Sequence, residues 1–152
     1  PKHLHLPIEG QINVIKEFFG MTSVHIRRGD FLTNPELYGV CNKEYYLRAI
    51  ALIKQKVACA KFLFFSDDIR WVKENFNDTA FLFAEDSNSA KQDLYLMSLC
   101  SNQILSNSSF SWWGAWLNCN DKKIIVAPSK WYVDGELERS AGDIVPHDWL
   151  RI

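Results

Sequence analysis

Two adjacent arginines near the start of the chain could bind an anion. The segment His25–Asp30 reads His-Ile-Arg-Arg-Gly-Asp and ends a β-rich run, so alternation along a strand places His25 and Arg27 on one face. Two guanidinium groups at a strand end are costly unless an anion neutralises them, and each can grip phosphate oxygens with paired hydrogen bonds. Because a departing pyrophosphate develops negative charge, Arg27 and Arg28 predict a site for such a group, with Gly29 allowing close backbone approach.

Two other interpretations of this segment stay open. The arginines can simply pair with Asp30 and nearby acids, or the embedded Arg-Gly-Asp can act as a surface adhesion tripeptide. Adhesion requires an exposed loop tip, and a position at the end of a strand does not favour it.

A second polar cluster is Ser66-Asp67-Asp68, which follows a short apolar run. Two adjacent acids resemble the pairs that hold Mg²⁺ against a nucleotide. Aspartate at a helix start also serves as a cap and complements the helix dipole. We favour capping for one of Asp67 and Asp68, which leaves the other carboxylate to accept hydrogen bonds from the N1–H and N2–H groups of a guanine.

The third cluster places hydroxyls immediately before a tryptophan-rich helix, in the segment 107–116 (NSSFSWWGAW). Hydroxyls and backbone N–H groups at a helix N-terminus form a cradle for phosphate. The alternative is an ordinary capped helix that packs its tryptophans into the core, which we favour for the tryptophans but not for the hydroxyls. Gly114 is expected to permit close packing. Asn107-Ser108-Ser109 also matches the glycosylation pattern, an interpretation that its place among these hydroxyls disfavours.

The elements that position these clusters alternate between strands and helices. Strands are expected at 23–28, 61–66, 80–84, 103–105 and 123–127, and helices at 42–57, 67–76, 90–99 and 110–117, with Asn42 and Ser89 as caps. Such alternation predicts an α/β fold, a Rossmann-like doubly wound parallel sheet of about five strands. Ligands of these sheets lie at the carboxyl ends of the strands, where all three clusters fall.

Composition excludes several classes of protein. The 152 residues carry 17 Lys and Arg against 18 Asp and Glu, so the formal charge is −1 and the broad basic footprint of a nucleic-acid binder is missing. No run reaches about 18 apolar residues and the first ten residues lack a signal pattern, so we expect neither a membrane span nor a secretion signal.

The four cysteines are Cys41, Cys59, Cys100 and Cys119, far apart and without metal-ligand spacing. We expect four free thiols in a reducing compartment and no structural zinc site. Cys100 and Cys119 fall among apolar residues on expected helices, where cysteine packs as a small hydrophobe.

Three motifs in order, VHIRRGD, FFSDD and SNSSFSWWGAWL, give the region from Ser23 to Pro128 a resemblance to the α1,2-fucosyltransferases of glycosyltransferase family eleven, the bacterial members above all. The resemblance implies the C-terminal half of a GT-B enzyme, residues 1–22 being a residual N-terminal segment and 23–152 a GDP-fucose-binding domain. It also implies that no cofactor or metal is required.

The resemblance also implies roles for single residues. Arg27 would hold the β-phosphate and Arg28 would stand near the fucose and pyrophosphate. His25 and either Asp67 or Asp68 would contact guanine or its ribose. The phosphate and nucleoside pocket would be lined by Ser109, Phe110 and Ser111. Asp30 is the local candidate for general base, although a carboxylate beside two arginines has a depressed pKa and can serve only to orient them.

The function that follows is transfer of fucose from GDP-fucose to a galactose 2-hydroxyl of a glycan acceptor, with inversion. The alternatives are a non-catalytic nucleotide-sugar-binding module without its acceptor domain, and an unrelated transferase such as a GDP-mannose user. No nucleic-acid partner is expected, whereas the full-length protein can associate peripherally with a membrane. A bacterial-type protein would be cytoplasmic, and a eukaryotic one would lie in the Golgi lumen.

Overall fold

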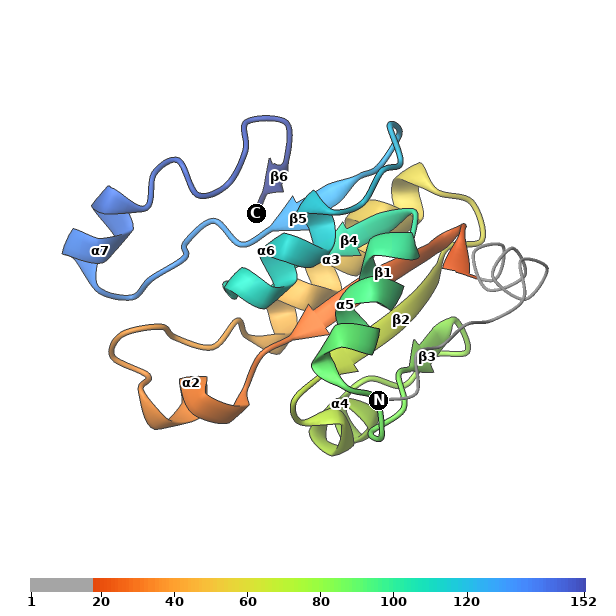
Figure 1. Cartoon of the computed structure of the whole chain (residues 1–152), viewed down its shortest axis with the longest axis horizontal. Coiled ribbons are helices and arrows are strands. Elements are labelled where there is room, and N and C mark those ends of the chain that lie inside the picture. The colour runs from red at the N-terminus through yellow and green to blue at the C-terminus, as the bar shows by residue number, and fades with distance from the viewer. Residues whose placement is uncertain (1–17) are drawn as a thin grey trace.

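The computed structural model describes residues 18–152, which fold around one parallel β-sheet (Figure 1). The strands of this part of the chain are β1 (Met21–Ile26), β2 (Lys61–Ser66), β3 (Phe81–Phe83), β4 (Asn102–Ile104), β5 (Ile125–Ala127) and β6 (Leu150–Arg151). Their order in the sheet is β3-β2-β1-β4-β5-β6 and every pairing is parallel. This order is that of the Rossmann fold, so the predicted fold class is confirmed. The strand beyond the expected five is β6, whose two residues carry too little pattern to be predicted.

Helices cover both faces of the sheet, with α5 and α6 in front of it in Figure 1 and α3 behind it. The helices are α2 (Gly29–Thr33), α3 (Lys43–Lys56), α4 (Ile69–Asn75), α5 (Ala90–Leu99), α6 (Ser109–Trp116) and α7 (Gly135–Ser140). The predicted caps are confirmed: the Asn42 side chain accepts the N–H of Tyr45, and Ser89 forms a capping box with Gln92. The short α2 and α7 were not predicted.

The core explains why β2 is a continuous apolar run. Phe62 and Phe64 join the cluster under α3 and α4, whereas Leu63 and Phe65 join a second cluster with Met97 of α5. A strand covered on both faces needs apolar side chains at every position. Gly114 brings α6 against α5, because a Cβ there would lie 2.7 Å from Met97 Cε.

The predicted boundaries and cysteine states can be compared with this structure. β1 begins at Met21, two residues before the expected domain start, and residues 1–17 of the expected N-terminal segment lie outside the described residues. All four cysteines are free thiols, as predicted, and burial raises the pKa of Cys100 to about 12. The prediction for Cys119 is wrong, because α6 ends at Trp116 and leaves this thiol exposed.

The order in which successive strands are added to the sheet reverses between β1 and β4, which are neighbours in the sheet although they are far apart in the chain. The chain leaves β1 toward α3 on one face and leaves β4 toward α6 on the other, so the two connections diverge and a crevice opens between them. The three polar clusters follow β1, β2 and β4 and therefore meet at this edge. Among residues 18–152, no helix is long and apolar enough to cross a membrane.

Candidate active site

A cleft of about 680 Å³ lies at the carboxyl ends of the strands. It is lined by the segments that follow β1, β2, β3, β4 and β5. Of the residues singled out in the sequence, the cleft wall contains His25, Arg27, Asp30, Asp67, Ser109 and Phe110. Three predicted residues are not part of the wall: Arg28, Asp68 and Ser111. Arg28 and Asp68 are hydrogen-bonded to wall residues, and Ser111 is hydrogen-bonded to Ser106, the neighbour of a wall residue.

Arg27 is held in the cleft by two carboxylates. Its Nε donates to Asp30 Oδ1 at 2.8 Å and one of its Nη groups lies 3.3 Å from Asp67 Oδ2. The hydrogen bond to Asp30 raises the pKa of the guanidinium and lowers that of the carboxyl, so both groups stay charged. The ion pairs of the described residues engage Nε and one Nη, which leaves the other Nη able to donate to a bound anion.

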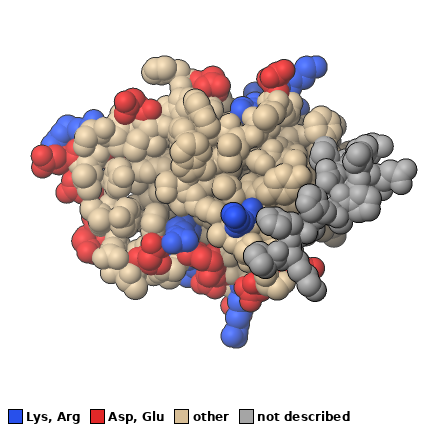
Figure 2. Space-filling model, viewed as in Figure 1, with Lys and Arg blue, Asp and Glu red and all other residues tan. Residues whose placement is uncertain are grey.

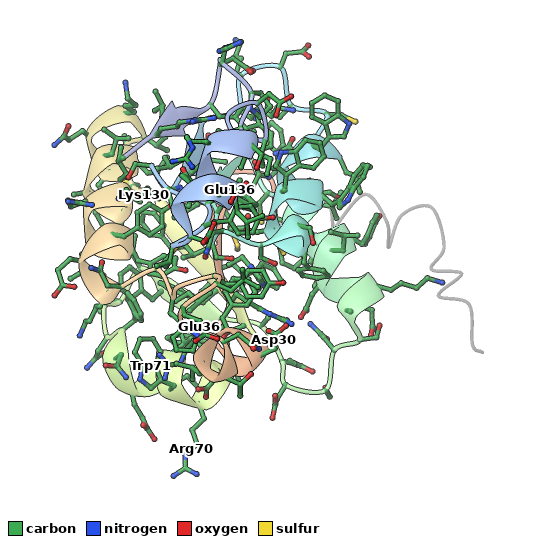
Figure 3. The ribbon with its side chains drawn as sticks, turned by 90° about the vertical axis from the view of Figure 1, so that its left-hand side faces the viewer. Asp30, Glu36, Arg70, Trp71, Lys130 and Glu136 are labelled. Atoms are coloured by element: carbon green, nitrogen blue, oxygen red, sulfur yellow. The ribbon has the colours of Figure 1, made fainter. Side chains whose placement is uncertain are left out.

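Arg28 points to the other side of α2, toward α4. Its guanidinium lies 3.7 Å above the ring of Trp71, and its Nε donates to Asp68 Oδ2 at 3.1 Å. Figure 3 labels Asp30 on α2 and, to the left of it, Trp71 on α4, the residue that Arg28 contacts. Alternation along an extended backbone separates neighbouring side chains in this way. The geometry gives Arg28 contacts that position the segment rather than a place in the cleft wall.

The two aspartates after β2 have separate tasks. Asp68 caps α4 by accepting the N–H of Trp71 at 3.2 Å, which agrees with the prediction that one of the pair is a cap. Asp67 is not free, contrary to expectation, because Oδ1 accepts the N–H of Arg28 at 3.0 Å while Oδ2 faces Arg27. Gly29 permits this arrangement, since a Cβ there would lie 2.6 Å from Asp67 Oδ2.

His25 is a buried, neutral imidazole at the base of the cleft. Only 3% of it is exposed, and its Nδ1 lies 3.0 Å from Ser106 Oγ. Burial, assisted by the charge of Arg27, lowers the pKa of His25 to about 3. The ring of Phe110 packs against it at a centroid distance of 5.2 Å. His25 can therefore donate or accept one hydrogen bond but carries no charge at neutral pH.

The first turn of α6 faces the cleft with its cap position unused. Ser108 makes no side-chain cap hydrogen bond, whereas α3, α4, α5 and α7 are all capped by a side chain. Ser108 and Ser109 both line the cleft. Ser111 is fully buried instead, and its Oγ accepts the N–H of Ser106 at 3.1 Å. It supports the turn from beneath.

The tryptophans of α6 are less buried than we expected. Trp112 packs under the C-terminal segment and donates from its indole to the carbonyl of Ile144 at 2.7 Å. Trp113 and Trp116 are 50% and 54% exposed, so the expectation that they pack into the core is wrong. Figure 2 shows mainly uncharged residues over the centre of the face that α5 and α6 cover, and no broad basic area on it.

One wall of the cleft is aromatic, and sequence reasoning missed it. Phe31 and Tyr38 stack at 4.6 Å with their planes 11° apart, and Tyr132 lies 6.1 Å from Tyr38. Trp131 completes this wall. The available signal was position, because Trp131 and Tyr132 follow β5 and the residues after each strand of such a sheet face the ligand.

The opposite end of the cleft is acidic, and it too was missed. Glu85 and Asp86 follow β3, and Asp93 lies on α5. Burial raises the pKa of Asp93, whose Oδ1 accepts from the Asn88 amide at 2.9 Å. Their position after β3 was again the signal. The cleft therefore runs from acids through Arg27 and the serines to aromatic rings.

Asn107 ties the cleft walls together from below. Its buried amide donates to the carbonyls of Tyr38 at 2.7 Å, Gly39 at 3.2 Å and Trp131 at 2.9 Å. An amide so placed is inaccessible to glycosylation, which agrees with the disfavoured status of that interpretation. Within residues 18–152, no group of three or more His, Cys, Asp or Glu side chains is arranged to hold a metal ion.

Comparison with known proteins identifies the family. A model described as Glycosyl transferase family 11 matches residues 5–152. The O-antigen biosynthesis glycosyltransferase WbnK of Escherichia coli is 40% identical over 145 residues, 91% of this chain and 47% of that protein. An alpha-1,2-colitosyltransferase of Escherichia coli is 41% identical over 138 residues, 86% of this chain and 47% of that protein.

A galactoside alpha-(1,2)-fucosyltransferase 1 of Alouatta belzebul is 30% identical over 105 residues, 64% of this chain and 29% of that protein. The chain thus spans less than half the length of the curated relatives it matches. The predicted resemblance, including its bacterial character, is confirmed, and this chain belongs to glycosyltransferase family 11.

Proposed function

We propose that this chain is the donor-binding half of a GT-B fucosyltransferase, which binds GDP-fucose and transfers fucose to a galactose 2-hydroxyl of a glycan acceptor. The observation that carries the proposal is the position of Arg27 at the switch point of the sheet, in one cleft with the uncapped first turn of α6. The family and the named activities of its relatives supply glycosyl transfer as the reaction class.

The pyrophosphate of the donor would lie between Arg27 and the serines. The unengaged Nη of Arg27 donates to one phosphate, while N–H groups of the first turn of α6 and the hydroxyls of Ser108 and Ser109 face the other. Because the leaving group gains charge as the sugar departs, these donors stabilise the transition state more than the ground state. Loss of one such donor lowers the rate by about 10²–10³.

The guanine of the donor would lie at the acidic end of the cleft. Asp68 caps α4 outside the cleft wall, and each oxygen of Asp67 already faces the N–H of Arg28 or the guanidinium of Arg27, so we assign the guanine edge to a carboxylate farther from the arginines. Asp93 is half-buried and reaches the cleft, and a carboxylate there can accept from the N1–H and N2–H donors of guanine. This assignment revises the one that the sequence suggested for Asp67 or Asp68.

Transfer would proceed by single displacement, with inversion from a β-linked donor to an α1,2 linkage. Asp30 is bound to Arg27 and its pKa is lowered, so we assign it to orienting the guanidinium rather than to accepting the acceptor proton. The general base that accepts the proton of the acceptor hydroxyl would then come from the portion of the relatives that this chain does not span. Independence from metal, a cytoplasmic location and peripheral membrane association of the whole protein remain predictions.

A second donor sugar is a specific alternative, because one relative is named as an alpha-1,2-colitosyltransferase and is 41% identical. A non-catalytic binding module is another, since the chain spans less than half of its relatives. Turnover of GDP-fucose and a galactoside by the chain would identify an enzyme, whereas donor binding without turnover fits both the donor half of an enzyme and a module. Competition between fucosyl and colitosyl donors distinguishes the two sugars.

The proposal is tested first by calorimetry with GDP. Arg27→Ala should lower GDP affinity by at least tenfold, since a hydrogen bond to a charged group is worth about 1.5–3 kcal/mol. The matched control is Arg70→Ala on α4, whose side chain is 90% exposed and pairs with Glu74 away from the cleft. Unchanged GDP affinity in a folded Arg27→Ala variant would exclude this phosphate site.

A further inference from the structure

The order of the strands bears on how a nucleotide sugar can lie in the cleft. Reading across the sheet, the cleft wall passes from the acids after β3 to Arg27 after β1, then to the serines after β4 and the tyrosine after β5. If the pyrophosphate occupies the centre, as the proposed function requires, its two ends point in opposite directions. A purine with N–H donors suits the acidic end, and the sugar is left with the aromatic end.

The rings at that end are arranged as a surface rather than as core packing. Phe31 is buried beneath Tyr38, and Arg27 Cζ lies 5.9 Å from the Phe31 centroid, so the rings continue directly from the phosphate site. Tyr38 and Tyr132 are only half-buried. Both also border a second hollow of about 230 Å³ on their other side, whereas a core ring is enclosed by side chains.

The backbone beneath these rings is fixed. Asn107 holds the carbonyls of Tyr38 and Trp131, and one oxygen of Glu138 accepts the N–H groups of Trp131 and Tyr132, each at 2.8 Å. The N–H of Val133 also donates to the carbonyl of Leu37 at 3.1 Å, which joins the two segments directly. Rigid support of this kind is typical of surfaces that orient a ligand.

Figure 3 looks onto this side of the molecule. Lys130 and Glu136 mark the segment that follows β5, and Asp30 and Glu36 mark the facing segment that begins with α2. The two segments project from one edge of the sheet, on the left in Figure 1. Tyr38 belongs to the segment that begins with α2 and Tyr132 to the segment that follows β5, so each segment contributes one ring to the cleft wall.

We propose that Tyr38 and Tyr132 form a platform for the pyranose ring of the transferred sugar, with Phe31 supporting Tyr38 from beneath and Asn107 and Glu138 as further positioning residues. The C–H groups on one face of a pyranose are apolar and lie flat against an aromatic ring, which leaves the hydroxyls at the ring edge to other partners. The inference deepens the proposed function and rests on it. It assigns the sugar, not the nucleotide, to the tyrosines.

The test compares GDP with GDP-fucose on the same variants by calorimetry. Tyr132→Ala should weaken GDP-fucose binding about fivefold, the loss expected when roughly 40 Å² of apolar surface is no longer buried, and should leave GDP affinity unchanged. Tyr132→Phe, which keeps the ring, should bind both ligands as the unaltered chain does. Tyr95→Ala, at an exposed position on α5 outside the cleft wall, is the matched control.

Each outcome decides a different question. Equal loss for GDP and GDP-fucose in Tyr132→Ala would overturn the platform, because the ring would then serve the nucleotide or the fold. Unchanged binding of both ligands would overturn it too, while the proposed function would stand. Failure of the unaltered chain to bind GDP would instead remove the proposed function, and the platform with it.

Discussion

Gly29→Ala should weaken nucleotide binding more than it weakens the fold. A Cβ at this position would lie 2.6 Å from Oδ2 and 3.4 Å from Cγ of Asp67, so the carboxylate must retreat. That movement separates Asp67 from Arg27, now 3.3 Å apart, and stretches its 3.0 Å hydrogen bond from the N–H of Arg28. The arginine that faces the phosphate then loses one of its two supports.

The magnitudes follow from exposure. The side chains of Arg27 and Asp67 are 31% and 25% exposed, so solvent screens their pair and it contributes under about 1 kcal/mol to stability. The hydrogen bond to the charged carboxylate adds a further 1.5–3 kcal/mol or so if it is lost outright, and the better helix propensity of alanine in α2 offsets up to about 1 kcal/mol. Because the bond from the Arg28 N–H is stretched and not lost outright, we expect the free energy of unfolding to fall by about 1–2 kcal/mol and GDP affinity to fall about tenfold to a hundredfold.

Urea denaturation measures the first quantity and calorimetry with GDP the second. Gly142→Ala is the control, because its Cβ would meet only the carbonyl of Arg139 at an ordinary 3.7 Å. Full GDP affinity in a folded Gly29→Ala variant would refute the reasoning that Asp67 holds Arg27 in its binding position.

Two further predictions concern metal and pH. GDP binding should persist in EDTA, because arginine and helix N–H groups supply the positive charge, and strict Mg²⁺ or Mn²⁺ dependence would contradict this. The pKa of His25 is about 3 in the folded state against 6.5 in the unfolded state. Between these values the unfolded state binds the extra proton, so the free energy of unfolding decreases as the pH is lowered. Urea denaturation should show that the free energy of unfolding falls by about 2 kcal/mol when the pH is lowered from 7.5 to 5. This loss should be missing in His25→Gln and present in the control His147→Gln. The same pH profile in His25→Gln as in the unaltered chain would count against a neutral buried ring.

Local sequence signals predicted the regular elements well. The bounds of β2 at Lys61–Ser66 match those expected, since a buried parallel strand is apolar throughout. The caps Asn42 and Ser89 located α3 and α5, because their side chains bond to N–H groups a few residues along the chain. In each case the residues that carry the signal lie within the element that they specify or directly beside it.

The parts of the site that could not be predicted depend on contacts between distant segments. Arg28, some forty residues earlier, contacts both aspartates, since its Nε binds Asp68 and its N–H binds Asp67, and this second contact could not be predicted from the segment 66–68 alone. The aromatic wall lies in segments without apolar periodicity, and its shape is set by Asn107, which lies far from Tyr38 and Trp131 in the chain. No pattern within one segment encodes such contacts.

The placement of Ser109 and Ser111 could have been refined from helix geometry. Residues two apart on an α-helix point about 200° from one another, so both hydroxyls could not face the cleft. The structure keeps Ser109 in the cleft wall and buries Ser111. The same reasoning along an extended backbone separates Arg27 from Arg28.

Base selectivity tests the central claim, that this cleft holds a guanosine diphosphate sugar, most directly. Asp93 can accept from the N1–H and N2–H groups of guanine, whereas uracil lacks the exocyclic amine and adenine presents a different edge. Calorimetry should show GDP bound at least tenfold more tightly than UDP or ADP, since a lost hydrogen bond to a charged group costs about 1.5–3 kcal/mol. Asp93→Asn should narrow the gap, and Asp121→Asn, outside the cleft wall, should not. Equal affinity for the three diphosphates would reduce the cleft to a general phosphate site and contradict the account.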